Sequence, residues 1–291
     1  MALRYFRILA WVGVVAGLLA LVVGCGGALQ PAFDSIGIGR LGAATAVAVC
    51  APVALGARGW LMAAGVVVAM LPLIMARVVP GEAGSIGVYS KNLHFRNPDT
   101  APITADIRTQ NPDVVVLQEV STRNDVILSA LSVAYPHQFM CRSAGWNGIA
   151  ILSKTPFVAA SQACSPVRAL ARVQIDAVDG PFWVVGVHLD WPWPKGQMGD
   201  VKRALPVISG LDGHVIVAGD FNNVPWSHAA QLIGQATHTL PLSPRRATYW
   251  LNVIPLPLDQ VWAPCGGRME RRPQFTSDHY GVMARVNAAT C

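Results

Sequence analysis

An uninterrupted apolar stretch near the N-terminus constrains this chain more than any other feature of its sequence. Residues 8–29 form a run of 22 residues without a charged side chain. About 20 apolar residues in a helix are enough to cross the hydrocarbon core of a bilayer. Two further apolar stretches, 41–57 and 60–79, follow after short connections. The sequence therefore predicts three transmembrane helices within residues 1–79.

Two other interpretations of this region are open. The first is a cleaved signal peptide followed by buried helices, although the apolar part of a signal peptide is usually about 7–15 residues long and this one is longer. The second is a lipoprotein, because Val22-Val23-Gly24-Cys25 is similar to a lipoprotein cleavage site. Two further apolar stretches after a lipidated cysteine would be unusual, so the three-span interpretation is favoured.

Charged residues are sparse and unevenly placed. They make up 13% of the chain, against about 25% in typical soluble proteins. The first 79 residues hold five arginines and Asp34, which is +4 of the formal +6, so the remainder carries only +2. That remainder lacks the basic excess expected of a nucleic-acid-binding domain.

The arginines in the apolar region also predict its orientation. Arg4 and Arg7 precede the first stretch and Arg58 lies between the second and third, whereas Arg40 lies in the other connection. The positive-inside rule then places the N-terminus in the cytoplasm. After three spans, the rest of the chain is extracytoplasmic. The predicted localisation is the cell membrane, as a multi-pass protein.

Beyond the apolar region the pattern becomes that of a soluble α/β domain. Residues 80–84, with Pro80 and two glycines, predict a linker, and residues 85–291 the domain. The strand candidates are 85–90, 114–118, 148–152, 171–177, 182–188, 215–219, 258–262 and 281–286. The helix candidates are 101–110, 122–133, 200–211 (with Pro206 expected to kink or split it) and 226–235. We expect the proline- and arginine-rich segments 236–257 and 263–276 to be loops. This pattern alone permits a doubly wound parallel sheet.

Polar residues lie where several of these strands end. The apolar run 114–117 leads into Gln118-Glu119, and 215–218 leads into Gly219-Asp220. Strand ends on a rigid scaffold commonly carry binding and catalytic groups. Burying a bare carboxylate is very costly. We therefore expect these acids to be solvated, paired or bound to a metal ion.

An ordered series of such residues resembles the endonuclease/exonuclease/phosphatase superfamily over about residues 85–287. The series is Asn92, Glu119, the Gly148-Ile149-Ala150-Ile151-Leu152-Ser153 run, His188, Asp220 with Asn222, Asp259, and Asp278 with His279. The resemblance implies a four-layer α/β/β/α sandwich, with two mixed sheets face to face and helices outside. One departure is Gln260, which replaces the aromatic residue or histidine that usually follows the aspartate at position 259.

The resemblance also implies a metal site. Glu119 would be the main ligand of a divalent cation, with Asn92 beside it and Asp278 as a further contact. Such a hard cation prefers oxygen ligands. The expected ion is Mg²⁺, with Mn²⁺ as the alternative.

The catalytic roles come from the same resemblance. Asp220 would position or deprotonate the attacking water, and Asn222 would stabilise charge in the transition state. If the backbone stays extended, residues two apart lie on one side of it. Asp259 would orient His279 and raise its pKa. His188 would bind phosphate or protonate the leaving group.

Two features near these residues are candidates for substrate specificity. Trp191 and Trp193 closely follow His188 and are suited to stack on a base, to enter a bilayer interface, or to pack beneath a proline-stiffened loop. Several arginines in the expected loops are suited to contact phosphate, or are simply solvated. These are Arg245, Arg246, Arg268, Arg271 and Arg272.

The cysteines fit an extracytoplasmic domain. Cys25 and Cys50 lie in apolar stretches, where a small apolar role is the default. The other four, an even number, allow three pairings. They are Cys141, Cys164, Cys265 and Cys291. The absence of a Cys-x-x-Cys spacing argues against zinc.

Together these observations predict a membrane-anchored, metal-dependent phosphoesterase. Its substrate would be a phosphodiester or phosphomonoester of an envelope lipid or glycan, and its other partner the bilayer. An extracytoplasmic nuclease is the alternative, with nucleic acid as a less favoured partner. A catalytically inactive binding module is disfavoured because every expected acid and both histidines are present.

Overall fold

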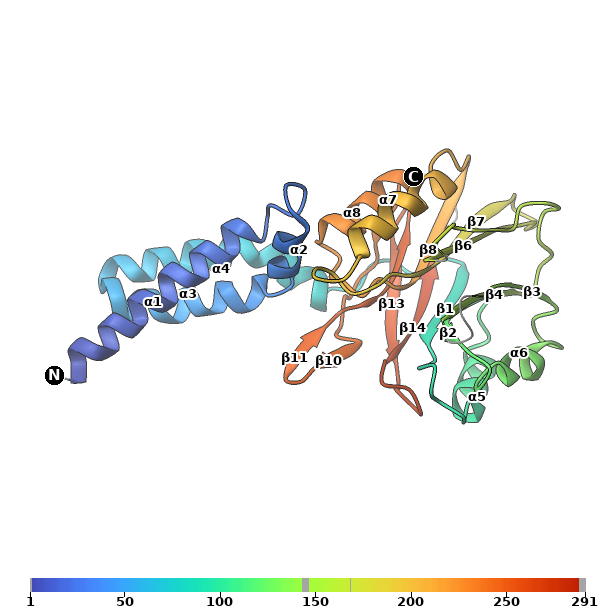
Figure 1. Cartoon of the computed structure of the whole chain (residues 1–291), viewed down its shortest axis with the longest axis horizontal. Helices are drawn as coiled ribbons and strands as arrows, with labels where there is room; N and C mark the ends of the chain where they lie inside the picture. Colours follow the sequence, from blue (N-terminus) through green and yellow to red (C-terminus); the bar gives the residue numbers. More distant parts are fainter. Residues whose placement is uncertain (1, 143–146, 168, 288–291) are drawn as a thin grey trace.

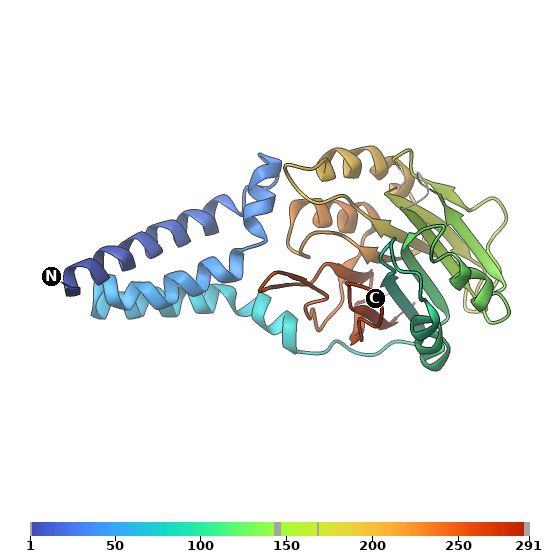
Figure 2. The same ribbon diagram turned by 60° about the horizontal axis from the view of Figure 1, so that its bottom comes forward.

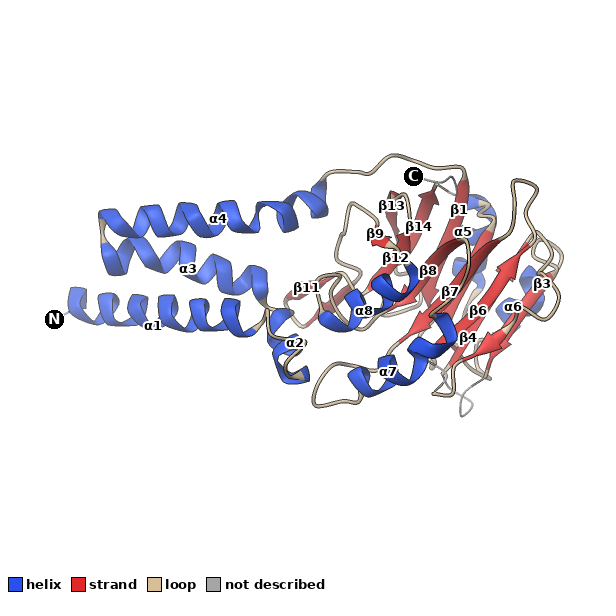
Figure 3. Cartoon of the chain, turned by 90° about the horizontal axis from the view of Figure 1, so that it is seen from above, coloured by secondary structure: helices blue, strands red, loops and turns tan. Residues whose placement is uncertain are grey.

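The computed structural model describes residues 2–142, 147–167 and 169–287. A rod of helices projects from an α/β domain (Figures 1 and 2). The rod contains α1 (Ala2–Val23), α2 (Pro31–Gly37), α3 (Arg40–Leu55) and α4 (Ala57–Val78). The N-terminus and the connection between α3 and α4 lie at the end of the rod far from the domain, whereas α2 lies beside the domain (Figure 3).

Apolar side chains cover the outer surface of this rod. The exposed ones include Leu3, Phe6, Trp60 and Leu61. Ala10 and Val14 of α1 pack with Ala51 and Ala54 of α3 in a small internal core. Such a surface suits a hydrocarbon environment better than water.

Three spans were expected, and the structure supports two or three. Within the described residues, the segments Leu3–Val23 and Ala57–Val78 are long and apolar enough to cross a membrane. The first ends at Val23, so residues 24–29 lie outside it. Helices α2 and α3 meet at 58°, and they are long and apolar enough to cross a membrane only if both belong to one span. Alone, α3 has 16 residues, about 24 Å at a rise of 1.5 Å per residue. That is less than the ~30 Å of a hydrocarbon core.

The domain contains two six-stranded mixed sheets. The first has the order β13-β14-β1-β2-β4-β3 and the second β5-β6-β7-β8-β12-β9. The strands of the first sheet are β1 (Ile86–Asn92), β2 (Val114–Val120), β3 (His137–Cys141), β4 (Gly148–Ser153), β13 (Gly267–Arg272) and β14 (Gly281–Val286). Those of the second are β5 (Ala163–Cys164), β6 (Leu170–Ile175), β7 (Phe182–His188), β8 (His214–Asp220), β9 (Leu240–Pro241) and β12 (Asp259–Ala263). A separate hairpin consists of β10 (Tyr249–Leu251) and β11 (Ile254–Leu256).

Helices cover both outer faces of this pair of sheets (Figure 3). Those on the first sheet are α5 (Ala101–Gln110) and α6 (Val126–Leu131), and those on the second are α7 (Gln197–Ile208) and α8 (His228–Thr237). Val116 of β2 faces the core between the sheets, whereas its neighbours Val115 and Leu117 face the helices. Side chains alternate along a strand, so a strand buried on both faces reads as an uninterrupted apolar run. The α/β/β/α sandwich is thus confirmed, and the doubly wound sheet is excluded.

The segments expected to be loops contain real strands. Residues 236–257 include β9 and the β10–β11 hairpin, and residues 263–276 include β13. In β13, buried Gly267 and Met269 alternate with exposed Arg268 and Glu270, because the strand covers only the edge of its sheet. Because every second residue of this pattern is charged and exposed, the segment was expected to be a loop. Pro206 does not split α7, since the helix continues through it to Ile208.

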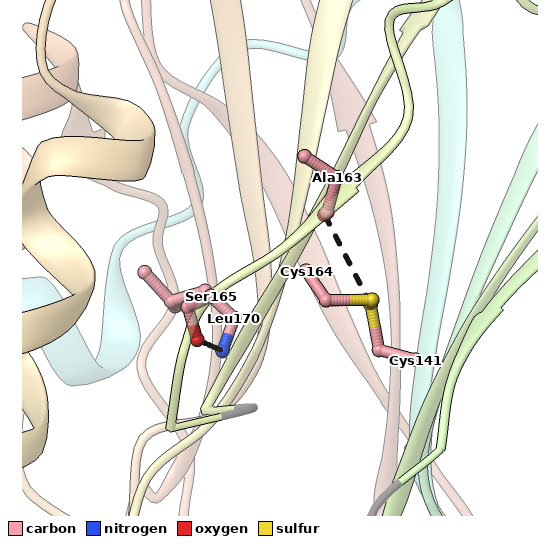
Figure 4. Close-up of a disulfide and its surroundings, with 5 residues drawn as sticks. All are labelled: Cys141, Ala163, Cys164, Ser165 and Leu170. Atoms are coloured by element: carbon pink, nitrogen blue, oxygen red, sulfur yellow. Dashed lines mark hydrogen bonds between the residues drawn. A yellow bond between two sulfur atoms is a disulfide. The ribbon is translucent and has the colours of Figure 1, made fainter.

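A disulfide joins the two sheets (Figure 4). Cys141 of β3 is bonded to Cys164 of β5, and each strand lies at the edge of its sheet. The two residues are 23 apart in sequence. Closing a loop of that size stabilises a fold by about 3 kcal/mol on the chain-entropy account. Of the three possible pairing schemes, the one that contains Cys141–Cys164 is therefore favoured. Cys291 lies outside the described residues. Cys25 and Cys50 are free thiols.

Helix α8 of the domain is capped by an acid from the helical rod. The buried carboxylate of Asp34 accepts hydrogen bonds from the backbone N–H groups of His228 (2.7 Å) and Ala229 (3.1 Å). Ser227 accepts one from Ala230 at 3.2 Å. The first N–H groups of a helix have no partner within the helix, and an acid there also offsets the positive end of the helix dipole. Asp34 therefore stabilises α8 and fixes α2 against the domain.

Two further hydrogen bonds strengthen this junction. The indole N–H of Trp226 donates to the carbonyl of Gly37 at 2.8 Å. The hydroxyl of Ser35 donates to the carbonyl of Trp193 at 2.9 Å. Trp193 and Trp226 lie in the loops that follow β7 and β8, so the rod contacts both of those loops.

We predict that Asp34→Ala destabilises the domain. Losing a helix cap costs about 1 kcal/mol, which corresponds to a fall of roughly 2–4 °C in Tm for a domain of this size. Thermal unfolding of the full chain in detergent, followed by near-ultraviolet circular dichroism, measures the change. Glu82→Ala, which removes an exposed acid from the linker, is the control. Equal Tm values for the two variants would show that the Asp34 cap does not stabilise α8.

Candidate active site

The carboxyl ends of two parallel strand pairs meet at one edge of the sandwich. In the first sheet β1 is parallel to β2, and in the second β7 is parallel to β8. Asn92 ends β1 and Glu119 lies near the end of β2, while His188 and Asp220 end the other pair. Because the sheets pack face to face, residues from both contribute to a single polar centre.

Asn92 joins the two sheets at this centre. Its Nδ2 donates to Oε1 of Glu119 at 3.1 Å and to Oδ2 of Asp220 at 3.0 Å. Its Oδ1 accepts a hydrogen bond from the backbone of His94 at 2.9 Å. One buried amide therefore holds a carboxylate from each sheet.

An irregularity in β2 places the Glu119 carboxylate. The pairing of β2 with β4 shifts register between Leu117 and Val120, and Glu119 has a φ of 55° in the left-handed region. A bulge of this kind re-aims a side chain, and strained backbone is typical of functional sites. The second oxygen, Oε2, accepts a hydrogen bond from the backbone of Phe95 at 2.8 Å. The side chain remains 19% exposed.

Asp220 is completely buried beside two histidines. Burial raises the pKa of Asp220, and the opposing attraction of His279 and His188 does not cancel this effect. Its Oδ1 accepts a hydrogen bond from the backbone N–H of Asn222 at 2.8 Å. A raised pKa makes the Asp220 carboxylate a stronger base than an exposed one.

Asn222 does not continue the strand, which corrects the expected extended geometry. Its φ is 45°, in the left-handed region, so the chain turns directly after β8. The turn forms because the Asp220 carboxylate binds the backbone two residues on, a common role for Asp in turns. Asn222 Nδ2 donates to the carbonyl of Leu189 at 2.8 Å, which ties its side chain to the loop after His188.

His279 and Asp259 form a buried hydrogen-bonded pair. His279 Nδ1 lies 2.9 Å from Asp259 Oδ2, and Nε2 lies 3.7 Å from Oδ2 of Asp220. Burial opposes the charged imidazole, but Asp259 and Asp220 outweigh it and raise the pKa of His279 to about 10. Among the described residues Asp259 Oδ1 has no hydrogen-bond partner. The imidazole is therefore held in one orientation and charged at neutral pH.

His188 faces the same centre from the other side. Its Nε2 lies 3.7 Å from Glu119 Oε1 and 4.0 Å from Asp220 Oδ2. Its Nδ1 is hydrogen-bonded to the amide oxygen of Asn147. An acceptor at Nδ1 requires a proton there, so Nε2 is the nitrogen that faces the site. Asn147 was not predicted from the sequence, although it directly precedes the Gly148 run.

Asp278 stands apart from the other predicted ligands. It is exposed, and in the described part of the chain no hydrogen bond or ion pair joins its carboxylate to Glu119 or Asn92. Its charge nevertheless helps to raise the pKa of Tyr249, after the larger effect of burial, and that of His279, after the larger effects of Asp259 and Asp220 and against burial.

The sequence also did not predict Lys91 and Tyr249. Lys91 is completely buried and donates to the carbonyls of Pro273, Gln274 and His279, which fixes the loop that carries His279. Burial lowers the pKa of Lys91 to about 8. The ring of Tyr249 lies 4.7 Å from that of His279. The position of Lys91 inside an otherwise apolar strand could have indicated its role. Tyr249 lies in a segment expected to be a loop, where no pattern of residues indicated such a role.

The donor atoms suit a hard divalent cation. The carboxylates of Glu119, partly exposed, and Asp220, buried, converge around Asn92, and oxygen donors are those that Mg²⁺ prefers. The Asn92 amide turns its Nδ2 toward both carboxylates, so its Oδ1 is directed elsewhere, to the backbone of His94. Asp220, Asp259 and His279 also place possible ligand atoms within 4.8 Å of one another. Asp259 and His279 are hydrogen-bonded to each other, however, so these atoms are already engaged. The side of the centre with Glu119 is therefore the better cation site.

Comparison with known proteins agrees with this arrangement. A sequence model described as "Endonuclease/Exonuclease/phosphatase family" matches residues 89–279. The matched range contains every residue of the polar centre. No curated protein matches the sequence.

Solved structures share the fold. An AP endonuclease from Archaeoglobus fulgidus is 13% identical with a TM-score of 0.56, covering 70% of this chain and 100% of its own. Humanized D. rerio TDP2 is 17% identical with a TM-score of 0.53, covering 68% and 97%. Beta toxin from Staphylococcus aureus, solved with bound magnesium ions, is 16% identical with a TM-score of 0.52, covering 69% and 99%. At these identities the similarity establishes the fold alone.

We predict that Asp259→Asn lowers the pKa of His279. Against the effect of burial, Asp259 and, after it, Asp220 and Asp278 raise the pKa from the ordinary 6.5 to about 10, so the stability that these contacts contribute is complete below pH 6.5 and is lost as the pH rises through about 10. NMR titration of the imidazole nitrogens in EDTA-treated full chain measures the pKa. Asp212→Asn removes an exposed carboxylate at the opposite end of β8 and is expected to leave it unchanged. The assignment is wrong if both variants titrate as the wild type does.

Proposed function

Because this chain belongs to the endonuclease/exonuclease/phosphatase family, whose members hydrolyse phosphoesters, we propose that it is a membrane-anchored, metal-dependent phosphoesterase. Its substrate is a phosphodiester or phosphomonoester of an envelope lipid or glycan. The observation that carries this proposal is one polar centre in which His188, Asn92 and the His279–Asp259 pair surround Asp220, with Glu119 beside His188 and Asn92. Such a centre combines proton-transfer groups with a site for a cation.

The cation of this proposal is Mg²⁺, with Mn²⁺ as the alternative. Glu119, Asn92 and Asp278 would hold it, with the Asn92 amide turned over so that Oδ1 replaces Nδ2 beside the carboxylates. When bound, it polarises a phosphoryl oxygen and offsets the negative charge of the phosphate. The partly exposed carboxylate of Glu119 leaves its side of the centre open to an ion from solvent.

The protein's own residues would handle the water and the charge. Asp220 is the base for the attacking water, since its raised pKa suits proton transfer near neutral pH. His279, charged and oriented by Asp259, binds a phosphoryl oxygen and stabilises the negative charge of the transition state. Asn222 supports the same charge with its second amide hydrogen, since the first is bonded to Leu189.

His188 completes the proton transfer. Asn147 accepts the Nδ1 proton, so Nε2 faces the polar centre, and the imidazolium form, which carries a second proton on Nε2, can deliver that proton to the leaving oxygen. The two histidines approach Asp220 from different strands, β7 and the segment before β14. Both histidines can therefore contact one phosphate bound beside Asp220.

We place the domain outside the cytoplasm. The N-terminus and the α3–α4 connection share one end of the rod and the domain lies at the other (Figure 1), so Arg4, Arg7 and Arg58 lie on the side away from the domain. The positive-inside rule assigns that side to the cytoplasm. The Cys141–Cys164 disulfide supports an oxidising compartment for the domain.

A lipid or glycan substrate is favoured over nucleic acid by the way the loop arginines are used. Arg271 stacks on Tyr280 with its guanidinium 4.2 Å from the ring centre, and Arg272 pairs with Asp106 at 2.6 Å. Arg268 pairs with Glu270 at 3.1 Å. Arginines engaged within the protein are less able to form the basic surface that duplex binding requires. The structural similarity to TDP2 and an AP endonuclease keeps a nuclease as the second candidate.

We predict that Glu119→Gln impairs metal-dependent hydrolysis. The amide keeps the shape of the side chain but removes the charge that attracts the cation. We expect the Mg²⁺ concentration for half-maximal activity to rise by more than about tenfold. Hydrolysis of bis(p-nitrophenyl) phosphate by the full chain in detergent, titrated with Mg²⁺, measures it. Glu82→Gln in the linker is the matched control, and near wild-type turnover of Glu119→Gln at limiting Mg²⁺ would show that Glu119 is not the main ligand.

The same preparation distinguishes the two candidate functions. Phospholipid, sugar-phosphate and nucleic-acid substrates are compared with Mg²⁺ and with EDTA, at low and moderate salt. A nuclease that depends on several phosphate contacts loses activity steeply as salt rises. Metal-dependent turnover of a lipid or glycan phosphate supports the proposal, and turnover of nucleic acid alone contradicts it.

A further inference from the structure

The tip of the β10–β11 hairpin exposes a compact group of apolar side chains. Trp250, Leu251, Val253 and Ile254 are 48%, 42%, 84% and 50% exposed. They are separated only by Asn252, which has a φ of 54° and forms the turn. Single exposed apolar residues are common on proteins, whereas a contiguous group marks a contact surface.

The hairpin lies where α4 reaches the domain. Arg77 of α4 donates to the carbonyl of Pro255 in β11 at 3.5 Å. One residue earlier, the carbonyl of Ala76 accepts a hydrogen bond from the backbone of Arg245 at 2.8 Å. Figures 1 and 3 show the hairpin on the side of the domain that faces the helical rod. If α4 crosses the bilayer, the hairpin tip lies at the membrane surface where α4 emerges.

The base of the hairpin reaches the polar centre. Tyr249 begins β10, and its ring lies 4.7 Å from that of His279 and 5.8 Å from that of Trp191. The loop of Trp191 continues to Trp193, which is 56% exposed and whose carbonyl accepts the hydrogen bond from Ser35 of α2. Two aromatic elements therefore border the site, and each also contacts the helical rod.

We propose that the hairpin tip inserts into the bilayer leaflet nearest the domain. The site then takes its phosphate ester from an amphiphile of that leaflet. The occupant of the apolar surface is the lipid bilayer, because the hairpin continues the apolar surface of α4 at its domain end. Tryptophan at the edge of the tip suits the interface between headgroups and acyl chains. This inference rests on the proposed function for its substrate, but the insertion itself can be tested separately.

The first experiment measures insertion without activity. A Val253→Cys variant of the full chain, with Cys25 and Cys50 replaced by alanine, is labelled with an environment-sensitive fluorophore. It is reconstituted in vesicles of phosphatidylethanolamine and phosphatidylglycerol, with and without doxyl-labelled phospholipid. Val178→Cys is the matched control, because Val178 is also highly exposed but lies before β7, at the end opposite His188.

We expect emission from position 253 to shift to shorter wavelength and to be quenched by doxyl lipid, and emission from position 178 to do neither. Equal quenching at the two positions would overturn the proposal. Self-quenching that depends on protein density, without quenching by doxyl lipid, would also overturn it, since the tip would then contact a second copy.

The second experiment separates substrate delivery from chemistry. Leu251→Ser, Val253→Ser and Ile254→Ser are combined in one variant, because all three lie around the turn of the hairpin, whereas Tyr249 begins β10 at its base. We expect turnover of a phospholipid in vesicles to fall by about tenfold, because membrane affinity scales with buried apolar area. Hydrolysis of soluble bis(p-nitrophenyl) phosphate is expected to be unchanged. Equal losses on both substrates, or no loss on either, would contradict delivery through the hairpin. A wild type inactive on every phosphoester would refute the proposed function, while the fluorescence result would still decide insertion.

Discussion

The amide of Asn92 holds together two carboxylates that belong to different sheets. Glu119 and Asp220 would repel one another if both were charged and close, and the amide of Asn92 donates to each at about 3 Å. This contact exists only because β1 and β8 are packed face to face through the core between the sheets. His188 and His279 reach the same point from the strands around it. The chemistry of the site therefore depends on the sandwich, and the disulfide between β3 and β5 reinforces that packing.

Much of this arrangement could be predicted from the sequence. The apolar run before Glu119 predicted a buried strand. The ordered motifs, through the resemblance that they carry, predicted the two sheets and most of the polar centre. The hydrogen bonds of Asn147 with His188 and of Asp34 with α8 could not be predicted. Each joins segments far apart in sequence, and neither has a periodic pattern. The end of α3 was also misjudged, because composition alone does not show that the chain turns at Gly56, where φ is 62°.

The helical rod does more than add apolar surface to the chain. Asp34 caps α8, Ser35 binds the loop after β7, and α4 contacts the β10–β11 hairpin. These contacts fix the edge of the sandwich that carries the site relative to the rod. In the proposed account, a phosphoesterase with low net charge finds its substrate by position, through anchoring beside a bilayer, and needs no basic surface to attract it.

The central claim is that residues from both sheets act as one catalytic unit, and the rates of three variants test it most directly. Asp259 is expected to act only through the imidazole of His279, to which it is bonded at 2.9 Å. Groups that act as a unit have non-additive effects. Hydrolysis of a soluble phosphodiester is measured for His279→Ala, Asp259→Ala and the double variant under saturating Mg²⁺. We predict that the double variant is little slower than His279→Ala alone. Fully additive losses would mean that the two residues work separately and would contradict the account.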